Sequence, residues 1–385
     1  GRLGSQPGSD YPYQSVFNMA EGYFLFDGTR YPTGISTPSL INPHLTWEKS
    51  TSKNLGFDFT FLKNRLTFSA DIFDRKVTDI LIPGGKSYPA LIGDDDLPFE
   101  NAGVLKTTGF ELQAKWSDRL PGGFSYSVGA ALSDDQAKVL SYPSNPTNKI
   151  GDGVLYKGYT VGDIWGYVTG GILQEGDFDG VGANGKPLYH GPYFKGGQAY
   201  PGYVWYQDLD HDGVITSGQS TVDDPGDRKV IGNSSPRYRY NITANMQYKG
   251  FDLDLMFQGV GKRDYWLSST SSYWGNGAGS WETYNNSWTP ERTDAQFPMY
   301  GSGVGSYTQT GYLLDASYIK LKQVILGYTF PKSWIGKIGL EKLRLNIAAY
   351  NLFTISGVPK YYDSDYLSDA YPPKRTFSLG IQVGF

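Results

Sequence analysis

The sequence predicts an all-β fold, an antiparallel transmembrane β-barrel, on the strength of three observations. Apolar and polar residues alternate along segments of about nine to twelve residues. Short turns and long connections join these segments in alternation. The 385 residues include 50 glycines, 16% aromatic residues and 19% charged residues, whereas proteins average about 7% glycine and about 25% charged residues. This composition excludes a disordered chain, which would be rich in charge and poor in aromatic residues.

The first hairpin shows the pattern in its simplest form. Apolar and polar residues alternate over 55–61, Lys63-Asn64-Arg65 offers a turn, and the alternation resumes over 66–72. Because alternation gives a strand one apolar and one polar face, we expect two paired strands here. Further strands are expected at 110–116 with 124–132, at 238–246 with 253–257, at 324–330 with 343–349, and at 377–385.

The connections between these hairpins are long and span 80–103, 133–236, 261–317 and 355–375. Loops beyond about 15 residues are uncommon in compact domains, whereas outer-membrane barrels combine short turns on one side with long loops on the other. The apolar strand faces would then meet lipid, the polar faces would line the lumen, and aromatic residues near the strand ends would form interfacial girdles. We therefore expect 133–236 and 261–317 to be extracellular loops.

A soluble β-sandwich is the alternative, because its strands alternate as well. Sandwich strands usually have about five or six residues, which is shorter than the segments found here. The polar faces carry Gly, Ser, Thr, Asn and Gln more often than Lys and Glu, and the sequence ends on an aromatic residue, Phe385. These features favour the barrel.

Composition also limits the chemistry that the chain can perform. A net charge of -4 argues against a nucleic-acid partner held by bulk positive charge. Cysteine is absent, which excludes a thiol nucleophile, and the only histidines are His44, His190 and His211, which leave few positions for a multi-histidine metal site. No segment approaches the about 18 apolar residues of a transmembrane helix, and the N-terminal residues lack the pattern of a signal peptide. No catalytic pattern emerges, and we expect no enzyme.

The strongest candidate site is an acidic stretch inside the 133–236 loop. Asp208, Asp210 and Asp212 precede Gly213, which gives the D-x-D-x-D-G pattern of the first half of a calcium-binding loop. Three carboxylates at alternate positions can converge on a hard cation, and the glycine permits a sharp turn. The backbone carbonyl of Val214 would be a further ligand. We expect a structural Ca²⁺ site, with Mg²⁺ as the other candidate; a solvated acidic turn is the plain alternative.

Aromatic residues gather in the 261–317 loop and form the second candidate site. Trp266, Tyr273, Trp274, Trp281 and Tyr284 lie within it. Flat aromatic faces stack on sugar rings, so these residues are expected to bind substrate. The alternative is that they pack the loops against one another or against a partner protein, since aromatic residues also dominate protein interfaces.

Several motifs together resemble the SusC/RagA family of TonB-dependent outer-membrane transporters of Bacteroidetes-type bacteria. The likeness follows the order of the family along essentially the whole chain. Its motifs are NPHLTWEKS at 42–50, YQDLDHDGVI at 206–215, VIGNSSP at 230–236, YKGFDL at 248–253, WTPE at 288–291, the strand at 343–353 that contains Asn351-Leu352-Phe353, and the terminal Phe385.

The resemblance also implies a further ligand for the acidic loop. An acidic residue stands just before the R-x-V-I-G stretch of the family, and here that residue is Asp227. Position 12 of the loop is Gln219 instead of the bidentate glutamate of an EF-hand, which departs from that pattern. The resemblance therefore implies a cation-binding-like segment over 208–227 that includes Asp227.

The resemblance implies that residues 1–385 are the C-terminal part of a transporter barrel, with the plug domain outside this chain. About ten strands are countable, and a barrel of the family's size has about 22. An open sheet would leave unpaired edges in lipid, where each unsatisfied backbone group is costly. We therefore expect another polypeptide, or a further part of the same one, to supply the rest.

The implied function is active import across the outer membrane, without covalent chemistry. A SusD-like lipoprotein would close over the loops, TonB would act through the plug, and the cargo would be an oligosaccharide or a peptide. Two alternatives stay open: a passive porin or adhesin barrel, and a soluble glycan-binding or glycan-active β-protein.

Overall fold

The computed structural model describes residues 19–26, 29–35, 40–84, 98–266, 281–300, 307–359, 362–367 and 373–385. Strands dominate these residues, and none of the helices among them is long and apolar enough to cross a membrane. The predicted sites at Tyr273 and Trp274 lie outside the described residues.

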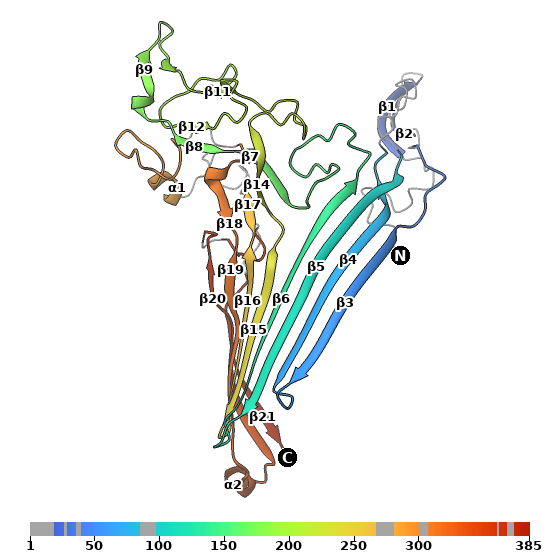
Figure 1. Ribbon diagram of the computed structural model, residues 1–385, viewed down its shortest axis with the longest axis vertical. Coiled ribbons are helices and arrows are strands. Elements are labelled where there is room, and N and C mark those ends of the chain that lie inside the picture. The colour runs from blue at the N-terminus through green and yellow to red at the C-terminus, as the bar shows by residue number, and fades with distance from the viewer. Residues whose placement is uncertain are drawn as a thin grey trace.

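Nine long strands form one antiparallel sheet, close to the ten or so strands expected from the alternation. In spatial order they are β3 (Lys49–Phe61), β4 (Leu66–Ile82), β5 (Glu100–Arg119), β6 (Ser125–Ser141), β15 (Arg237–Tyr248), β16 (Phe251–Lys262), β19 (Tyr318–Thr329), β20 (Lys342–Ser356) and β21 (Thr376–Gly384). Figure 1 shows that the sheet is a curved wall with tight hairpin turns at one end, here called the turn end. The long connections gather at the opposite end, here called the loop end.

The turns form where the sequence predicts them. Lys249 and Gly250 join β15 to β16 with φ angles of 46° and 88°, which is the left-handed pair that a two-residue hairpin needs. Between β19 and β20 the chain instead forms two short helices, α2 (Lys332–Ile335) and η4 (Gly336–Ile338).

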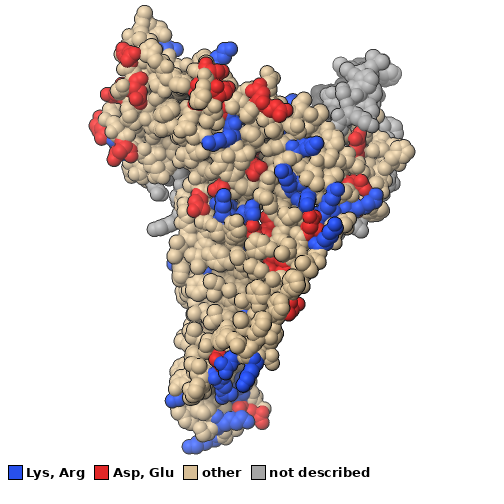
Figure 2. Space-filling model, viewed as in Figure 1, with Lys and Arg blue, Asp and Glu red and all other residues tan. Residues whose placement is uncertain are grey.

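The sheet exposes its apolar face. Phe57 is 49% exposed, Phe377 is 69% exposed and Leu379 is 73% exposed. Leu379 pairs with Ile347, which pairs with Leu326, so the apolar side chains form rows across strands. Figure 2 shows a largely uncharged band between the two charged ends of the molecule. These observations agree with the predicted barrel wall, in which this face meets lipid.

The strands run further toward the loop end than the apolar alternation indicates. Where a loop is expected from residue 133, β6 continues to Ser141. Asp134 interrupts the alternation, but the Nε and Nη2 groups of Arg237 donate to its two oxygens at 2.5 Å each. Because this ion pair satisfies the carboxylate, the acidic residue does not end the strand.

The remaining elements lie at the loop end (Figure 1), and they include β1 (Met19–Phe26) and β2 (Thr29–Ile35), which form a separate hairpin. The others are β7 (Asp163–Tyr167), β8 (Thr169–Ile172), η2 (Glu175–Asp177), β9 (Phe178–Val181), β10 (Pro187–Tyr189), β11 (Tyr193–Phe194), β12 (Val204–Tyr206), β13 (Val214–Ile215), β14 (Arg228–Asn233), β17 (Asp264–Trp266), α1 (Trp281–Asn285), η3 (Thr310–Tyr312) and β18 (Leu313–Asp315). They pair into two-stranded ribbons, such as β7 with β14. Residues 142–236 therefore hold structure of their own, with a buried core that includes Val204 and Tyr206.

Candidate functional site

The acidic loop begins with a turn that the Asp208 carboxylate organises. It accepts the N–H of His211 at 2.7 Å and the N–H of Gly213 at 2.8 Å. His211 and Gly213 both have left-handed backbones, with φ angles of 63° and 85°. The sharp turn predicted at Gly213 is therefore present, and Asp208 stands at its centre.

Asp227 joins the two ends of this loop although it follows many residues later. Its carboxylate is fully buried and accepts the N–H of Leu209 at 2.8 Å and the N–H of Thr216 at 2.7 Å. Carboxylate oxygens of Asp208, Asp210 and Asp227 lie within 4.8 Å of one another. The structure thus places these three predicted ligands together.

The three carboxylates influence one another electrostatically. Desolvation opposes the shift at Asp208, but hydrogen bonds from the Gly213 and His211 N–H groups outweigh it, so its pKa is lowered. The N–H of Asp212 hydrogen-bonds to Asp210, but desolvation and the negative charges of Asp227 and Asp212 outweigh this bond and raise the pKa of Asp210. A cation among these oxygens would relieve the repulsion, and an all-oxygen donor set fits a hard ion such as Ca²⁺ or Mg²⁺.

The other two predicted ligands are placed differently. The Asp212 carboxylate accepts the N–H of Val214 at 2.8 Å and is not part of the group formed by Asp208, Asp210 and Asp227. Val214 begins β13, which pairs in parallel with β11. The next residue, Ile215, is 1% exposed and packs into a core with Tyr167, Val204 and Tyr206, so the loop is anchored on its apolar side.

An exposed aromatic patch lies on and after α1. Trp281 is 77% exposed and Tyr284 is 55% exposed, and their rings meet edge to face at 5.6 Å. Tyr300, which the sequence did not single out, adds a third ring 5.6 Å from that of Tyr284. Trp266 lies elsewhere, in β17, opposite Leu313 of β18. Only Trp281 and Tyr284 of the described candidates are therefore brought together.

Two other aromatic residues of the long loops are buried and hydrogen-bonded. Tyr206 is 2% exposed, accepts a hydrogen bond from the Gln309 amide at 3.0 Å, and has its pKa raised by burial. Trp288 is 3% exposed, and its indole N–H donates to Gln174 at 2.9 Å. The burial of these two residues agrees with the packing alternative.

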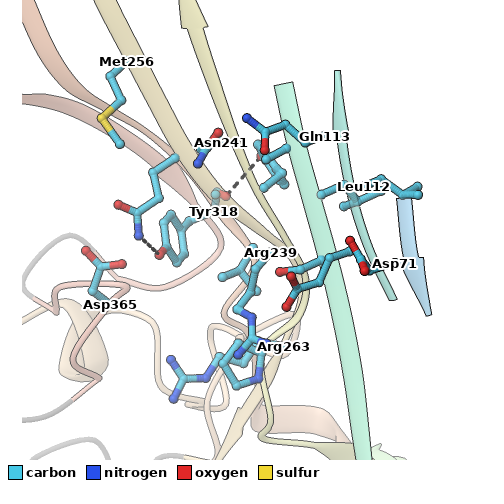
Figure 3. A pocket seen from close by; sticks show the side chains of 18 of the residues that line it. Asp71, Leu112, Gln113, Arg239, Asn241, Met256, Arg263, Tyr318 and Asp365 are labelled. Carbon is cyan, nitrogen blue, oxygen red and sulfur yellow. Dashed lines mark hydrogen bonds between the residues drawn. The ribbon is translucent and has the colours of Figure 1, made fainter. Parts of the chain in front are cut away.

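A pocket of about 640 Å³ opens on the polar face of the sheet (Figure 3). Asp71, Glu111, Asn241, Gln258 and Arg263 are among the residues that line it, and they come from β4, β5, β15, β16 and the residue after β16. Burial lowers the pKa of Arg263, whose Nε donates to the carbonyl of Ser234 at 3.0 Å. No local sequence pattern indicates this pocket, because its residues are far apart in the chain.

A buried ion cluster lies beside the pocket. Lys320 is 1% exposed, and its ammonium donates to Asp363 at 3.0 Å and to Asp365 at 2.7 Å. Desolvation would raise the pKa of Asp365, but hydrogen bonds from Lys320 and Tyr318 outweigh it and lower this pKa. Because Asp365 and Tyr318 also line the pocket, the cluster holds the segment 362–367 against the polar face of the sheet.

A second attachment fixes the far end of this segment. The Tyr265 hydroxyl donates to the carbonyl of Leu367 at 2.5 Å. Leu367 itself is 3% exposed and packs with Ala316 and Val358. The segment 362–367 is therefore an inward-folded part of the wall.

The comparisons with known proteins agree with this architecture. A family model described as "TonB dependent receptor-like, beta-barrel" matches residues 9–352. TonB-dependent receptor P3 of Formosa agariphila is 27% identical over 400 residues, which cover 97% of this chain and 38% of that protein. TonB-dependent receptor SusC of Bacteroides thetaiotaomicron is 27% identical over 401 residues, which cover 98% of this chain and 36% of that protein. The chain thus spans less than two fifths of the length of these relatives.

Solved structures share the fold. The RagAB peptide transporter superposes with a TM-score of 0.71 at 21% identity, over 98% of this chain and 39% of that one. The RagAB peptide importer in its open-open state superposes with a TM-score of 0.73 at 22% identity, over 98% of this chain and 38% of that one. The predicted resemblance to SusC and RagA is confirmed, and the chain belongs to the TonB-dependent receptor-like β-barrel family.

Proposed function

We propose that the chain is part of an outer-membrane importer that takes up an oligosaccharide or a peptide by a TonB-dependent route. Membership of the TonB-dependent receptor-like β-barrel family carries this proposal. The exposed apolar face of the sheet and the polar pocket on its other face support it. SusC and the RagAB peptide transporter are the relatives whose names fit such a role. The chain would contribute wall and loops and perform no covalent chemistry.

The sheet needs further strands to serve in this way. In the described residues, β3 and β21 are the outermost strands, and open edges are not tolerated in lipid. We infer that another part of the transporter, or a separate polypeptide, pairs with these edges and supplies the plug through which TonB acts.

The loop end would receive the cargo and a SusD-like surface lipoprotein. The patch of Trp281, Tyr284 and Tyr300 is exposed there. Its edge-to-face rings offer flat apolar surfaces that suit a sugar ring or a partner protein. We assign cargo capture to this patch.

The acidic loop would bind Ca²⁺, or Mg²⁺ in its place, in a structural role. Asp208, Asp210 and Asp227 would hold the ion, and backbone carbonyls and water would complete its shell. The ion would tie Asp227, which already joins the two ends of the loop, to the turn at Asp208. Asp212 would stabilise the turn through its hydrogen bond and would not bind the ion.

Uptake by cells tests the function. Cells that lack the intact transporter should lose growth on one class of nutrient, and restoration of the gene should recover it. A protonophore should abolish uptake, because TonB-dependent transport draws on the proton gradient. Uptake that survives the protonophore would support the passive porin, and a recombinant chain that stays soluble without detergent would support the soluble β-protein.

Two matched sets of variants separate cargo capture from loop packing. The substitutions Trp281→Ala and Tyr284→Ala should lower uptake at limiting nutrient by at least about tenfold, because aromatic anchors at binding sites often contribute 2 kcal/mol or more. Val181→Ala with Leu188→Ala removes exposed apolar side chains from the β9–β10 ribbon and should leave uptake unchanged. If both sets of substitutions change uptake equally, the patch does not capture cargo.

A further inference from the structure

The connection between β19 and β20 is unlike the other turns of the sheet. Residues 331–342, here called the hook, contain α2 and η4, and Ile335 is buried at 3% exposure as their anchor. Trp334 is 63% exposed and Ile338 is 70% exposed. A folded turn that holds a tryptophan and an isoleucine outward is built to meet an apolar surface, since exposing them to water forfeits their burial free energy.

The hook continues the lipid-facing side of the sheet. A series of aromatic contacts leads to the hook. The ring centroids of Phe251 and Tyr328 are 4.5 Å apart, those of Tyr328 and Phe330 are 4.9 Å apart, and those of Phe330 and Trp334 are 6.4 Å apart. Phe251 is 54% exposed, as is expected at the edge of the apolar face. Trp334 is thus the last member of an aromatic row that leads from the membrane-facing strands to the hook.

The hook also carries positive charge. Lys332, Lys337 and Lys342 are all exposed, and within the described residues the structure gives none of them an ion pair. The hook also contains one acidic residue, the exposed Glu341, and Asp252 of β16 is engaged by Arg344. Figure 2 shows mainly Lys and Arg side chains at this end, with fewer Asp and Glu, below the largely uncharged band. Three lysines against one glutamate leave the hook with an excess of positive charge that can act on a partner.

We propose that the hook is a binding surface for acidic phospholipid in the leaflet at the turn end. Trp334 and Ile338 insert at the level of the headgroups, and Lys332, Lys337 and Lys342 contact the headgroup phosphates. Tryptophan and lysine at the margin of an apolar surface are the residues that anchor proteins at membrane interfaces. The inference rests on the membrane placement under the proposed function and adds a lipid class to it.

Lipid retention tests the charge component. The intact transporter is purified from mixtures of phosphatidylglycerol and phosphatidylethanolamine, and bound lipids are counted by native mass spectrometry. Substitution of Lys332, Lys337 and Lys342 by Gln should lower retained phosphatidylglycerol by about tenfold or more, since each basic residue near an anionic surface contributes a few-fold. Substitution of Lys157, Lys186 and Lys195 by Gln removes three exposed lysines at the loop end and should change it less than twofold.

Quenching by brominated lipid tests the insertion. The fluorescence difference between the intact transporter and its Trp334→Phe variant isolates Trp334, and brominated phosphatidylglycerol should quench it. An equal loss of lipid in both lysine variants, or a Trp334 signal that brominated lipid leaves unquenched, overturns the proposal, as would a protein found bound to the hook. Heat-modifiable migration and nutrient uptake are measured on the same variants, so that a failure of the import proposal is seen separately.

Discussion

The sheet and the loops of this chain place the same kinds of side chain in opposite environments. Phe377 and Leu379 of β21 are 69% and 73% exposed, whereas Leu173 and Ile215 of the long loop are each 1% exposed. The strands therefore carry rows of apolar side chains on their outer face, whereas the loop end buries a core of them. Two rules of solvation operate within one polypeptide.

The difference is what the proposed membrane placement predicts, because the two regions would then meet different solvents. At the loop end, water drives apolar burial at about 25 cal/mol per Å², and buried polar groups such as the Tyr206 hydroxyl find partners. In lipid, burying apolar side chains gains no such free energy. The main requirement there is that every backbone N–H and C=O group of the strands is hydrogen-bonded. The pocket on the polar face of the sheet and the Lys320 ion cluster lie where the two regions meet.

The largest effect is expected at that junction, from Lys320→Met. The substitution leaves Asp363 and Asp365 without their cation, and removal of one partner of a buried ion pair costs about 3–5 kcal/mol. The segment 362–367 should then detach from the sheet. The measurement is hydrogen exchange of the amides of this segment in the intact transporter. The exchange rate should rise by at least about a hundredfold for such a loss of free energy.

Two companion variants keep this result specific. Lys322 lies 3.6 Å from Asp365 but its side chain is 29% exposed, so Lys322→Met should have a small effect. Adding Asp363→Asn and Asp365→Asn to Lys320→Met should restore part of the protection, because the unpaired buried charges are then gone. If Lys320→Met and Lys322→Met behave alike, the cluster does not hold the segment.

The sheet was predictable because its signals are local. Alternation over 55–61 and 66–72, and a turn signal such as Lys249-Gly250, involve residues close in sequence. The extension of β6 was not predictable, because Asp134 is neutralised by Arg237 from another hairpin. Local pattern therefore gave the strands but not their ends.

The sites were predictable only in part, for a related reason. The D-x-D-x-D-G pattern marks Asp208 and Asp210 in the sequence itself, but the place of Asp227 came from the family resemblance. Lys320 looks like any polar residue of a strand, and Asp363 and Asp365 follow it only after β20. The pocket on the polar face joins residues of β4, β5, β6, β15, β16, β19 and the segment 362–367, and no local signal could show it.

The second prediction tests the outward face directly through β21. Arginine in place of a lipid-facing residue costs about 2–4 kcal/mol near the bilayer midplane, and much less on the lumen face. Leu379→Arg should therefore impair assembly, whereas Ser378→Arg, one residue earlier on the other face, should be tolerated. Heat-modifiable migration and urea titration of the intact transporter measure both; equal tolerance would mean that the apolar face does not meet lipid.

The smallest effect is expected at the acidic loop, and it comes from a ligand and not from a packed core. If Ca²⁺ binds Asp208, Asp210 and Asp227, then Ca²⁺ at a hundred times its dissociation constant should stabilise the loop by about 2.7 kcal/mol. Hydrogen exchange of residues 208–216 with Ca²⁺ and with a chelator measures this gain. Asp227→Asn keeps the shape of the buried side chain but removes its charge, so the gain should largely vanish. Asp223→Asn, at an exposed position outside the group of three carboxylates, should retain the gain in protection. If Ca²⁺ does not change hydrogen exchange in the unaltered chain, the three carboxylates form a hydrogen-bonded turn and not an ion site.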